Sequence, residues 1–269
     1  GKGDGEWKYY NSIGELTEKR NLAEGRLQGE NTMYHDGKVH FIVSYKNDLA
    51  VKIQYFDKNG KELFKAENGS GNFNVKSYYA HGQLNGEGAY KKGKMEGAWK
   101  FYYPEGSKRS EFSYKDGELD GKAREFFRNG AVQFDMSYKA GQFDGYFIEY
   151  FGNGQIKQEG WFQQGERQQQ WITYHTNGNK ETEYYYLNDN LTGDYADYGA
   201  TGKIYSASVY KRGKVESLKY FNSKGELITV VTEKGNSKIY ENKYKSGKIQ
   251  ATIEIQCGNY VGNLVKRFP

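Results

Sequence analysis

Apolar and polar residues alternate along short stretches of this chain, in a pattern typical of β-strands. Residues 99–103 (Trp-Lys-Phe-Tyr-Tyr) form one such stretch, and residues 109–114 form the next. Pro104-Glu105-Gly106 follows the first and Asp116-Gly117 follows the second, and these residue types are strong turn signals. No stretch has the apolar period of about 3.6 residues that marks a helix. The sequence therefore predicts an all-β protein built from hairpins.

The hairpin pattern repeats every 24 residues through the middle of the chain. If the first residue of each unit is position 0, positions 5 and 17 are always aromatic and position 9 is always glycine. The units begin at Phe73, Gly97, Gly121, Gly145, Gln169 and Gly193; position 5 holds Tyr78, Tyr102, Phe126, Tyr150, Tyr174 and Tyr198; position 17 holds Tyr90, Tyr114, Tyr138, Phe162, Tyr186 and Tyr210. Such a repeat predicts stacked units that each contact mainly their neighbours.

Alternation along the second strand of each unit places positions 11, 15 and 17 on one face of the sheet. The intervening positions hold Lys, Glu, Gln or Ser, so the opposite face is expected to be wet. No helix or second sheet is evident that would cover the apolar face. We expect its cover to be the aromatic side chains, neighbouring strands of a curled sheet, or a partner. The predicted fold is an elongated single-layer antiparallel sheet of stacked β-hairpin repeats of about 24 residues.

The pattern continues toward both ends of the chain with changed spacing. The sequence predicts a single repeat array over residues 1–269, with regular units over 73–216 and less regular units over 1–72 and 217–269. Tyr244-Lys245-Ser246-Gly247 belongs to the last of these. Residues 1–5 resemble the junction between two units, which predicts a mature form or a fragment. It remains open whether a signal peptide, lipid anchor or further domain precedes residue 1.

Composition and charge narrow the choice of partner. The chain has 26 Tyr against 3 Met, as expected of thin β-structure whose side chains are half buried. Its 39 basic and 34 acidic residues give a net charge of +5, and the two signs are interleaved. Nucleic-acid binding proteins instead carry a stripe of positive charge, so no nucleic acid partner is expected. A weakly cationic face is compatible with an anionic membrane surface.

The sequence contains no recognisable group of catalytic or metal-binding residues. His35, His40, His81 and His175 lie far apart in the repeat, and none has a second ligand at the spacing that a metal needs. Cys257 is the single cysteine, which excludes an internal disulfide and favours a buried apolar role over a nucleophilic one. Carboxylates fall at turns and wet strand positions. The sequence therefore predicts no enzyme, no catalytic residue, no metal site and no cofactor.

Aromatic residues outside the two regular columns are the remaining candidates for binding. They could form an exposed surface that stacks on sugar rings, a peptide or another subunit. The alternative, which we favour, is that they pack over glycines of the next hairpin. The candidate binding residues are Trp7, Trp99, Tyr103, Phe127, Phe151, Trp161 and Trp171.

The pattern Gly-x-Trp-x-x-Tyr-Tyr, followed by a Tyr-Lys-x-Gly-x-x-x-Gly corner, resembles the MORN repeat, in the bacterial variant often labelled a YwqK-type antitoxin component. The residues that carry the resemblance are Gly97, Trp99, Tyr102, Tyr103, Gly106, Tyr114, Gly117 and Gly121. The resemblance covers nearly the whole chain and implies a MORN-like solenoid of stacked hairpins. For function it implies a scaffold, a dimerisation surface or a membrane-proximal adaptor. The fold alone does not identify an activity.

Three functions follow from these observations. The first is a non-catalytic scaffold or protein–protein interaction module with a protein partner, as a subunit or adaptor in a cell-envelope assembly. It would belong to an exported, periplasmic or envelope-associated bacterial protein, with a cytoplasmic location left open. The second is a carbohydrate or cell-wall binding array, for which the 4 tryptophans of this chain are few. The third is a toxin-neutralising antitoxin component, as the family label suggests.

Overall fold

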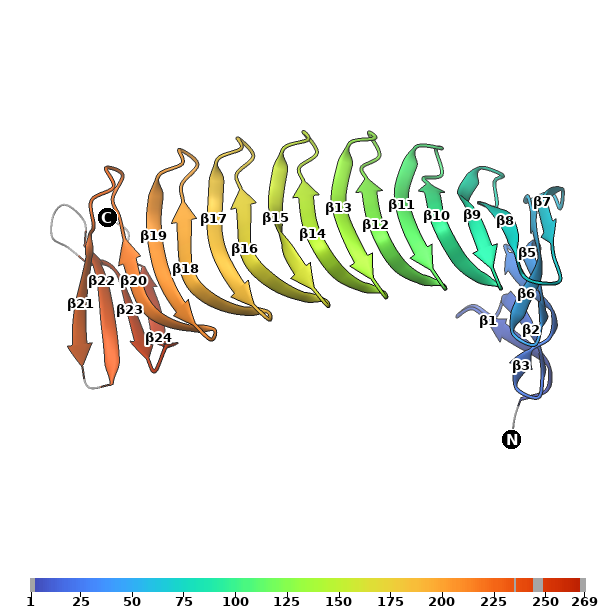
Figure 1. Cartoon of the computed structure of the whole chain (residues 1–269), viewed down its shortest axis with the longest axis horizontal. Coiled ribbons are helices and arrows are strands. Elements are labelled where there is room, and N and C mark those ends of the chain that lie inside the picture. Colours follow the sequence, from blue (N-terminus) through green and yellow to red (C-terminus); the bar gives the residue numbers. More distant parts are fainter. Residues whose placement is uncertain (1–2, 235, 244–248, 267–269) are drawn as a thin grey trace. The chain divides into compact units, whose positions relative to one another are not determined.

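The computed structural model describes residues 3–234, 236–243 and 249–266. Every regular element in these ranges is a β-strand, which confirms the all-β prediction (Figure 1). The strands form three antiparallel sheets. Within the same ranges, no helix is long and apolar enough to cross a membrane. The expected repeat at Tyr244-Lys245-Ser246-Gly247 lies outside the described residues.

The first sheet has seven strands in the order β1-β2-β4-β5-β6-β7, with β3 paired to β2. Its strands are β1 (Gly5–Tyr10), β2 (Leu16–Ala23), β3 (Arg26–Leu27), β4 (Gly29–His35), β5 (Lys38–Lys46), β6 (Leu49–Phe56) and β7 (Glu62–Glu67). The third sheet pairs four strands in chain order. They are β21 (Thr229–Lys234), β22 (Ser237–Lys243), β23 (Ile249–Gln256) and β24 (Asn259–Lys266).

The second sheet contains the regular repeats, in thirteen strands that pair in chain order from β8 to β20. Its strands are β8 (Phe73–Tyr78), β9 (Leu84–Lys91), β10 (Lys94–Tyr102), β11 (Lys108–Lys115), β12 (Glu118–Phe126), β13 (Val132–Lys139), β14 (Gln142–Tyr150), β15 (Ile156–Gln163), β16 (Glu166–Tyr174), β17 (Lys180–Leu187), β18 (Asn190–Tyr198), β19 (Ile204–Lys211) and β20 (Lys214–Tyr220). Each regular unit thus supplies two strands and two turns, as the sequence predicts.

The chain divides into two compact units. The first runs to Gln133 and also contains Ser137–Gln142, whereas the second contains Phe134–Met136 and continues from Phe143. The first unit therefore holds the seven-stranded sheet and strands β8 to β12. The second holds most of β14, strands β15 to β20, and the four-stranded sheet.

Two kinds of turn join the strands of the second sheet. Two-residue turns, such as Asp116-Gly117, have positive φ at both residues (51° and 89°), as type I′ turns require. Longer turns, such as the one after β10, close when the Tyr103 N–H donates to the Ser107 carbonyl and the Gly106 N–H donates to the Tyr103 carbonyl, both at 2.8 Å. Gly106 has a φ of 93° there, which explains why position 9 is always glycine.

The first residue of each regular unit except Phe73 lies inside a strand and has a positive φ. Gly97 and Gly121 have φ values of 69° and 106°, and the register between β9 and β10 shifts between Glu96 and Lys100, the stretch that contains Gly97. An extra residue on one strand needs an unusual backbone conformation of this kind. Gln169 adopts the same conformation with a φ of 59°. For a residue with a Cβ atom, a left-handed backbone costs about 1–2 kcal/mol.

Gln169→Gly is therefore expected to raise the free energy of unfolding by about 1 kcal/mol. The opposite change at the equivalent position, Gly145→Ala, is expected to lower it by a similar amount. Gln158→Gly in the extended part of β15 is the matched control and is expected to destabilise by about 0.5–1 kcal/mol. Chemical denaturation of the three variants measures these changes. A Gln169→Gly variant no more stable than the wild type would contradict strain at the bulge.

One face of the second sheet, here called the packed face, carries most of the large rings. Trp99 and Trp171 lie on it, and each is 3% exposed. Trp99 covers Gly88, where an added Cβ atom would come within 2.2 Å of the indole, and Trp171 covers Gly160 at the same separation. A large side chain thus meets a glycine on the preceding strand. The ring therefore occupies the space that a side chain on the glycine would need, as close packing requires.

Neighbouring sheets cover part of the packed face. In the first unit, Ile53 of β6 forms a buried cluster with Val75 and Trp99. In the second unit, Val215 of β20 forms a buried cluster that includes Ile255 of β23. The expectation that no second sheet covers the apolar face is therefore wrong at these two places. The less regular repeats form sheets of their own, and a sequence period does not reveal where such sheets dock.

The two aromatic columns lie on opposite faces of the second sheet. Position 17 belongs to the packed face, where Tyr114 meets Trp99 edge-on with ring centroids 6.3 Å apart. Position 5 belongs to the other face, here called the open face, where the Tyr102 hydroxyl donates to Glu87 (2.7 Å). A register shift pairs Lys108, at position 11, with Tyr102. Position 11 therefore lies on the open face, and its expected place beside positions 15 and 17 is wrong.

Candidate functional site

The structure separates the aromatic candidates into buried and exposed residues. Trp99 and Trp171 are buried because each indole covers a glycine on the preceding strand. Their prediction as exposed binding residues is therefore wrong. Packing over glycine is confirmed for both, but the glycine lies on the preceding strand and not on the next hairpin as expected. Trp99 Nε1 donates to the Ala89 carbonyl (3.1 Å). Trp171 Nε1 is buried and has no hydrogen-bond partner within the described ranges.

This difference predicts that the two buried tryptophans tolerate phenylalanine unequally. Trp99→Phe removes a hydrogen bond and leaves the Ala89 carbonyl without that donor. Trp171→Phe removes a buried N–H without a partner, and such a group costs about 1–3 kcal/mol. Trp171→Phe should therefore lower the free energy of unfolding by at least about 1 kcal/mol less than Trp99→Phe does. Denaturation of the two variants measures this difference. Equal costs would contradict the difference between the two N–H groups.

Position 6 connects one repeat to the next. The Tyr103 hydroxyl donates to the backbone carbonyl at position 5 of the following unit (2.9 Å). Tyr79 and His175 occupy the equivalent position and make the same contact at 2.8 and 2.9 Å. Phe127 and Phe151 are half-buried there and have no polar group for this bond. Contacts at position 6 therefore stabilise the stacking of neighbouring repeats.

The two remaining tryptophan candidates are exposed. Trp7 of β1 is 48% exposed, and Trp161 of β15 is 37% exposed. Trp161 pairs across the hairpin with Tyr146 of β14, and their rings meet edge to face with centroids 6.0 Å apart. Tyr146 is 50% exposed. We call Tyr146, Glu159, Trp161 and Tyr174 the open-face patch, which lies on β14, β15 and β16 in the second unit.

Glu159 joins the tyrosines of the open-face patch. One carboxylate oxygen accepts a hydrogen bond from the Tyr174 hydroxyl (2.5 Å), and the other accepts one from the Tyr146 hydroxyl (3.1 Å). Burial is the main cause of the raised pKa of both tyrosines, and the hydrogen bond to Glu159 and its charge both add to the increase. Both phenols therefore stay protonated at neutral pH. Glu159 forms no ion pair with a basic side chain of the described residues.

The cross-strand neighbours of Glu159 are apolar. Ile148 of β14 and Ile172 of β16 pair with it on its two sides. In the first unit, the equivalent residues alternate in charge across neighbouring strands, because Glu111 pairs with Lys100 and Arg124. Opposite charges across strands stabilise a sheet. The open-face patch therefore presents a carboxylate that has hydroxyl partners but no facing cation.

Glu183, the carboxylate at the same position of the next unit, differs from Glu159 because it has a cationic partner. Glu183 of β17 lies 2.8 Å from Lys180 Nζ, and this bonded ion pair lowers the pKa of Glu183. The Tyr198 hydroxyl also donates to Glu183 (3.2 Å). Glu183 is thus neutralised within its own hairpin, whereas Glu159 is not.

The repeat pattern does not identify Tyr146, Glu159 and Tyr174 as members of a site. It places Tyr174 in the regular aromatic column and predicts that carboxylates lie at solvated positions. A usable signal was present, because position 14 is acidic in five consecutive units. These residues are Glu87, Glu111, Asp135, Glu159 and Glu183. Inspection of position 3, the cross-strand partner, leaves Glu159 and Glu183 without basic neighbours, and the ion pair of Glu183 with Lys180 then distinguishes the two.

Because of its open-face tyrosines, the folded protein is expected to become less stable at high pH. Burial, followed by the hydrogen bond to Glu87, raises the pKa of Tyr102 to about 12, above its unfolded value of about 10. This contribution to stability is complete below a pH of about 10 and is lost as the pH rises toward about 12. Denaturation midpoints should fall across this window, and Glu87→Gln should bring the Tyr102 titration closer to the unfolded value. A constant midpoint would contradict the prediction.

Two of the four histidines lie close together. His35 of β4 and His40 of β5 have ring centroids 6.3 Å apart, so the expectation that all four histidines lie far apart is wrong for this pair. Burial lowers the pKa of His40, which favours its neutral ring. In the part of the chain that the structure describes, no group of three or more His, Cys, Asp or Glu side chains could hold a metal.

Cys257 is exposed, which corrects its expected burial. It is the first residue of the two-residue turn between β23 and β24, where Cys257 and Gly258 have φ values of 49° and 78°. A residue in such a turn extends beyond the paired strands, so its side chain reaches solvent.

The profile of the MORN repeat variant family matches residues 95–116 and 119–140. These segments contain most of β10 to β13, two consecutive hairpins of the second sheet. The resemblance to MORN repeats is therefore supported by a family match in this part of the chain. Comparison with curated proteins found no match.

Three solved structures show low-level similarity to this chain. TcdB2–TccC3 is 11% identical over 93% of this chain and 15% of its own, with a TM-score of 0.22. The Photorhabdus luminescens Tc holotoxin pore is 13% identical over 91% and 19%, with a TM-score of 0.15. A porin-like protein from Bacteroides uniformis is 10% identical over 95% and 89%, with a TM-score of 0.18. The chain spans less than a fifth of the first two, and TM-scores this low support no functional comparison.

Proposed function

We propose that this chain is a non-catalytic scaffold that binds a protein partner through the open-face patch. The observation that carries the proposal is the Glu159 carboxylate, which lies beside exposed Trp161 and Tyr146 and faces no cation. The match of two hairpins to MORN repeat variants supports a repeat-based interaction module. Exposed aromatic residues that stand together on a surface are characteristic of interfaces.

The chemistry of the patch favours a basic segment of the partner. A lysine or arginine placed over Glu159 would supply the missing charge. Its aliphatic stem would lie along Ile148 and Ile172, and its cationic head would meet the rings of Trp161 and Tyr146. Each of these contacts uses a group that the sheet already holds in place, so little side-chain freedom is lost on binding.

Affinity purification of the native full-length protein from envelope and cytosolic fractions, followed by mass spectrometry, tests the proposal. A stoichiometric companion should be retained by the wild type and lost with Trp161→Ala or Glu159→Gln. With the purified companion, calorimetry should show about 30-fold weaker binding for Trp161→Ala, as expected for the truncation of an interface hot spot. High salt should also weaken binding.

Trp7→Ala is the matched control, because Trp7 is an exposed tryptophan outside the patch. It should bind the companion as tightly as the wild type does. A companion retained equally by Trp161→Ala, Glu159→Gln and Trp7→Ala would place the interface elsewhere. If no companion co-purifies from either fraction, the scaffold role itself is contradicted.

A carbohydrate or cell-wall polymer is the second candidate occupant of the same patch. The Tyr146–Trp161 pair offers ring faces for a sugar, and Glu159 offers a hydrogen-bond acceptor beside them. Trp99 and Trp171 cannot serve this role because they are buried. Glycan or peptidoglycan binding that survives high salt and is lost in Trp161→Ala would favour this candidate over a basic protein segment.

The setting of the scaffold is part of the proposal. A place in a cell-envelope assembly is supported by the Tyr- and Gly-rich composition, and recovery of the companion from the envelope fraction tests it. A toxin-neutralising role stays a prediction from the resemblance to the YwqK-type variant. It is tested by whether an adjacent small reading frame is lethal when it is expressed without this protein.

A further inference from the structure

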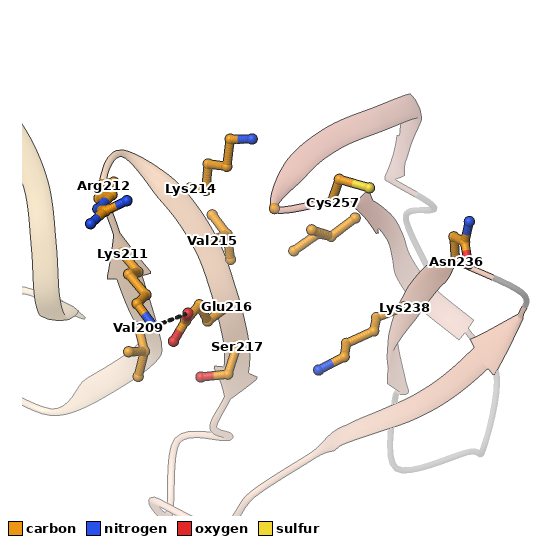
Figure 2. Close-up of a pocket in the computed structure, with 12 residues that line it drawn as sticks. Val209, Lys211, Arg212, Lys214, Val215, Glu216, Ser217, Asn236, Lys238 and Cys257 are labelled. Atoms are coloured by element: carbon orange, nitrogen blue, oxygen red, sulfur yellow. Dashed lines mark ion pairs between the residues drawn. The ribbon is translucent and has the colours of Figure 1, made fainter.

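A cleft in the second unit has a strongly basic lining. It has a volume of 910 Å³ and lies between β20, at the edge of the second sheet, and the strands of the third sheet (Figure 2). The Val215 N–H of β20 donates to the Gly258 carbonyl in the β23–β24 turn (2.8 Å). This bond connects the two sides of the cleft.

Basic side chains reach the cleft from several elements. Lys211 comes from β19, Arg212 from the following turn, Lys214 from β20, and Lys238 from β22. Figure 2 shows Lys238 extending from the third sheet toward β20. Glu216 is the acidic residue among the lining residues, so four positive groups face one negative group.

Basic residues outnumber acidic ones among the residues that line this cleft, although Glu233 of β21 pairs across strands with Lys238. Lys211 and Lys214 pair directly across the hairpin, and like charges in this arrangement destabilise a sheet. Glu216 lies 3.7 Å from Lys211 Nζ and offsets a single charge. A bound anion would remove the remaining repulsion, because it would lie close to groups from three strands at once.

The wall of the cleft strengthens this attraction. Val215 and Ile255 line it and belong to one buried cluster, at 3% and 4% exposure. Apolar side chains exclude water from one side of a bound ion, and charges attract more strongly where the local dielectric constant is low. Lysines act as point charges and are common ligands of phosphate groups.

We propose that this cleft binds a compact anion with two or more negative charges, of the pyrophosphate or phosphate-ester class. A single carboxylate would satisfy one of the basic side chains and leave the others repelling each other. Lysines on three different strands instead fit a ligand whose charges are spread over several oxygen atoms. The site lies apart from the open-face patch in the sequence and is independent of the proposed partner binding.

The β9–β10 hairpin provides an internal control. Lys91 and Lys94 pair across it, and Glu96 lies 3.3 Å from Lys91 Nζ, just as Glu216 lies near Lys211. This hairpin therefore repeats the local charges of the cleft without Lys238 and without the Val215–Ile255 wall. Lys94→Gln tests what the hairpin charges do alone, and Lys214→Gln tests the equivalent residue in the cleft.

Calorimetry of the whole chain with inorganic pyrophosphate tests the proposal. Lys214→Gln and Lys238→Gln should each weaken the dissociation constant about tenfold, because a charged hydrogen bond is lost. Lys94→Gln should change it less than about twofold. All three lysines are exposed, so the variants should fold, and their thermal midpoints without ligand should not fall below that of the wild type. No measurable binding, or equal weakening by Lys94→Gln and Lys238→Gln, would overturn the site in favour of diffuse surface charge.

Cys257 allows the site to be located without a structure of the complex. It lines the cleft, is exposed, and is the single cysteine of the chain. Bound pyrophosphate should slow its alkylation by neutral iodoacetamide severalfold in the wild type and leave the rate unchanged in Lys238→Gln. Alkylation that pyrophosphate does not slow in the wild type would place the anion elsewhere and overturn the proposal.

The source of the phosphate is decided by a competition experiment. Phosphatidylcholine vesicles with and without phosphatidic acid are compared for sedimentation of the protein. Sedimentation that requires phosphatidic acid, that pyrophosphate reverses and that Lys238→Gln abolishes identifies a lipid headgroup as the ligand. Pyrophosphate binding without sedimentation identifies a soluble phosphate compound. Sedimentation that Lys94→Gln reduces as strongly as Lys238→Gln contradicts a role of the cleft.

Discussion

Replacing Trp171 with alanine is expected to lower the free energy of unfolding of the second unit by about 3–5 kcal/mol. Trp171 is almost fully buried, and its ring meets Phe162 edge-on with centroids 5.0 Å apart. Gly160 lies beneath the indole and has no side chain, so it cannot fill the cavity that the alanine variant leaves. The backbone of a sheet cannot collapse into such a cavity, because its hydrogen bonds fix the strand spacing.

Hydrogen exchange of the β15, β16 and β17 amides is the measurement for this variant, because repeat proteins unfold in parts. Trp161→Ala is the matched control, since Trp161 is an exposed tryptophan on the adjacent strand. It is expected to change stability by less than about 1 kcal/mol. Equal losses in the two variants would contradict the division into a packed and an open face.

Gly160→Ala is expected to produce the second large effect, a loss of about 2–3 kcal/mol. An added Cβ atom would lie 2.2 Å from Cδ2 and 2.3 Å from Cε2 of Trp171. These atoms belong to a rigid fused ring, so the indole must move as a whole or the strands must separate. Gly152→Ala is the control, because nothing lies within 4 Å of its added Cβ atom, and it should change stability by less than about 0.5 kcal/mol.

A double variant distinguishes steric crowding from a general intolerance of substitution at Gly160. If Gly160→Ala acts by crowding the indole, combining it with Trp171→Phe should recover at least about 1 kcal/mol relative to the sum of the single effects. Denaturation of the four proteins in the cycle measures this coupling. Strict additivity would show that the alanine acts through the backbone instead of through Trp171.

The repeat period predicted the hairpins of the second sheet because their turns are locally encoded. Gly106 and the pair Asp116-Gly117 adopt positive φ values that few other residues accept. Glycine and asparagine at such places are therefore readable without any tertiary information. The bulge at Gly97 is also local in origin, and the exception at Gln169 shows that the fold can impose this conformation on a residue that disfavours it.

The division of the rings between the two faces could not be predicted from alternation alone. The register shift beside Tyr102 moves position 11 to the open face, and a single extra residue in a strand reverses every later assignment. Trp161 and Trp171 have the same chemistry, yet one is exposed and the other is buried. Their difference depends on the strand position of each residue and on the glycine that lies beneath Trp171.

Local sequence was sufficient to establish strands, turns and the 24-residue unit, because turn conformation and alternation depend on residues that are adjacent in the chain. Only the tertiary structure decided which carboxylate lacks a cation and which basic residues share a cleft. Glu159 meets Ile148 and Ile172 through strand pairing, and Lys238 reaches the cleft of Lys211 and Lys214 through the docking of a second sheet. Such contacts arise from register and packing, which a repeat period does not encode.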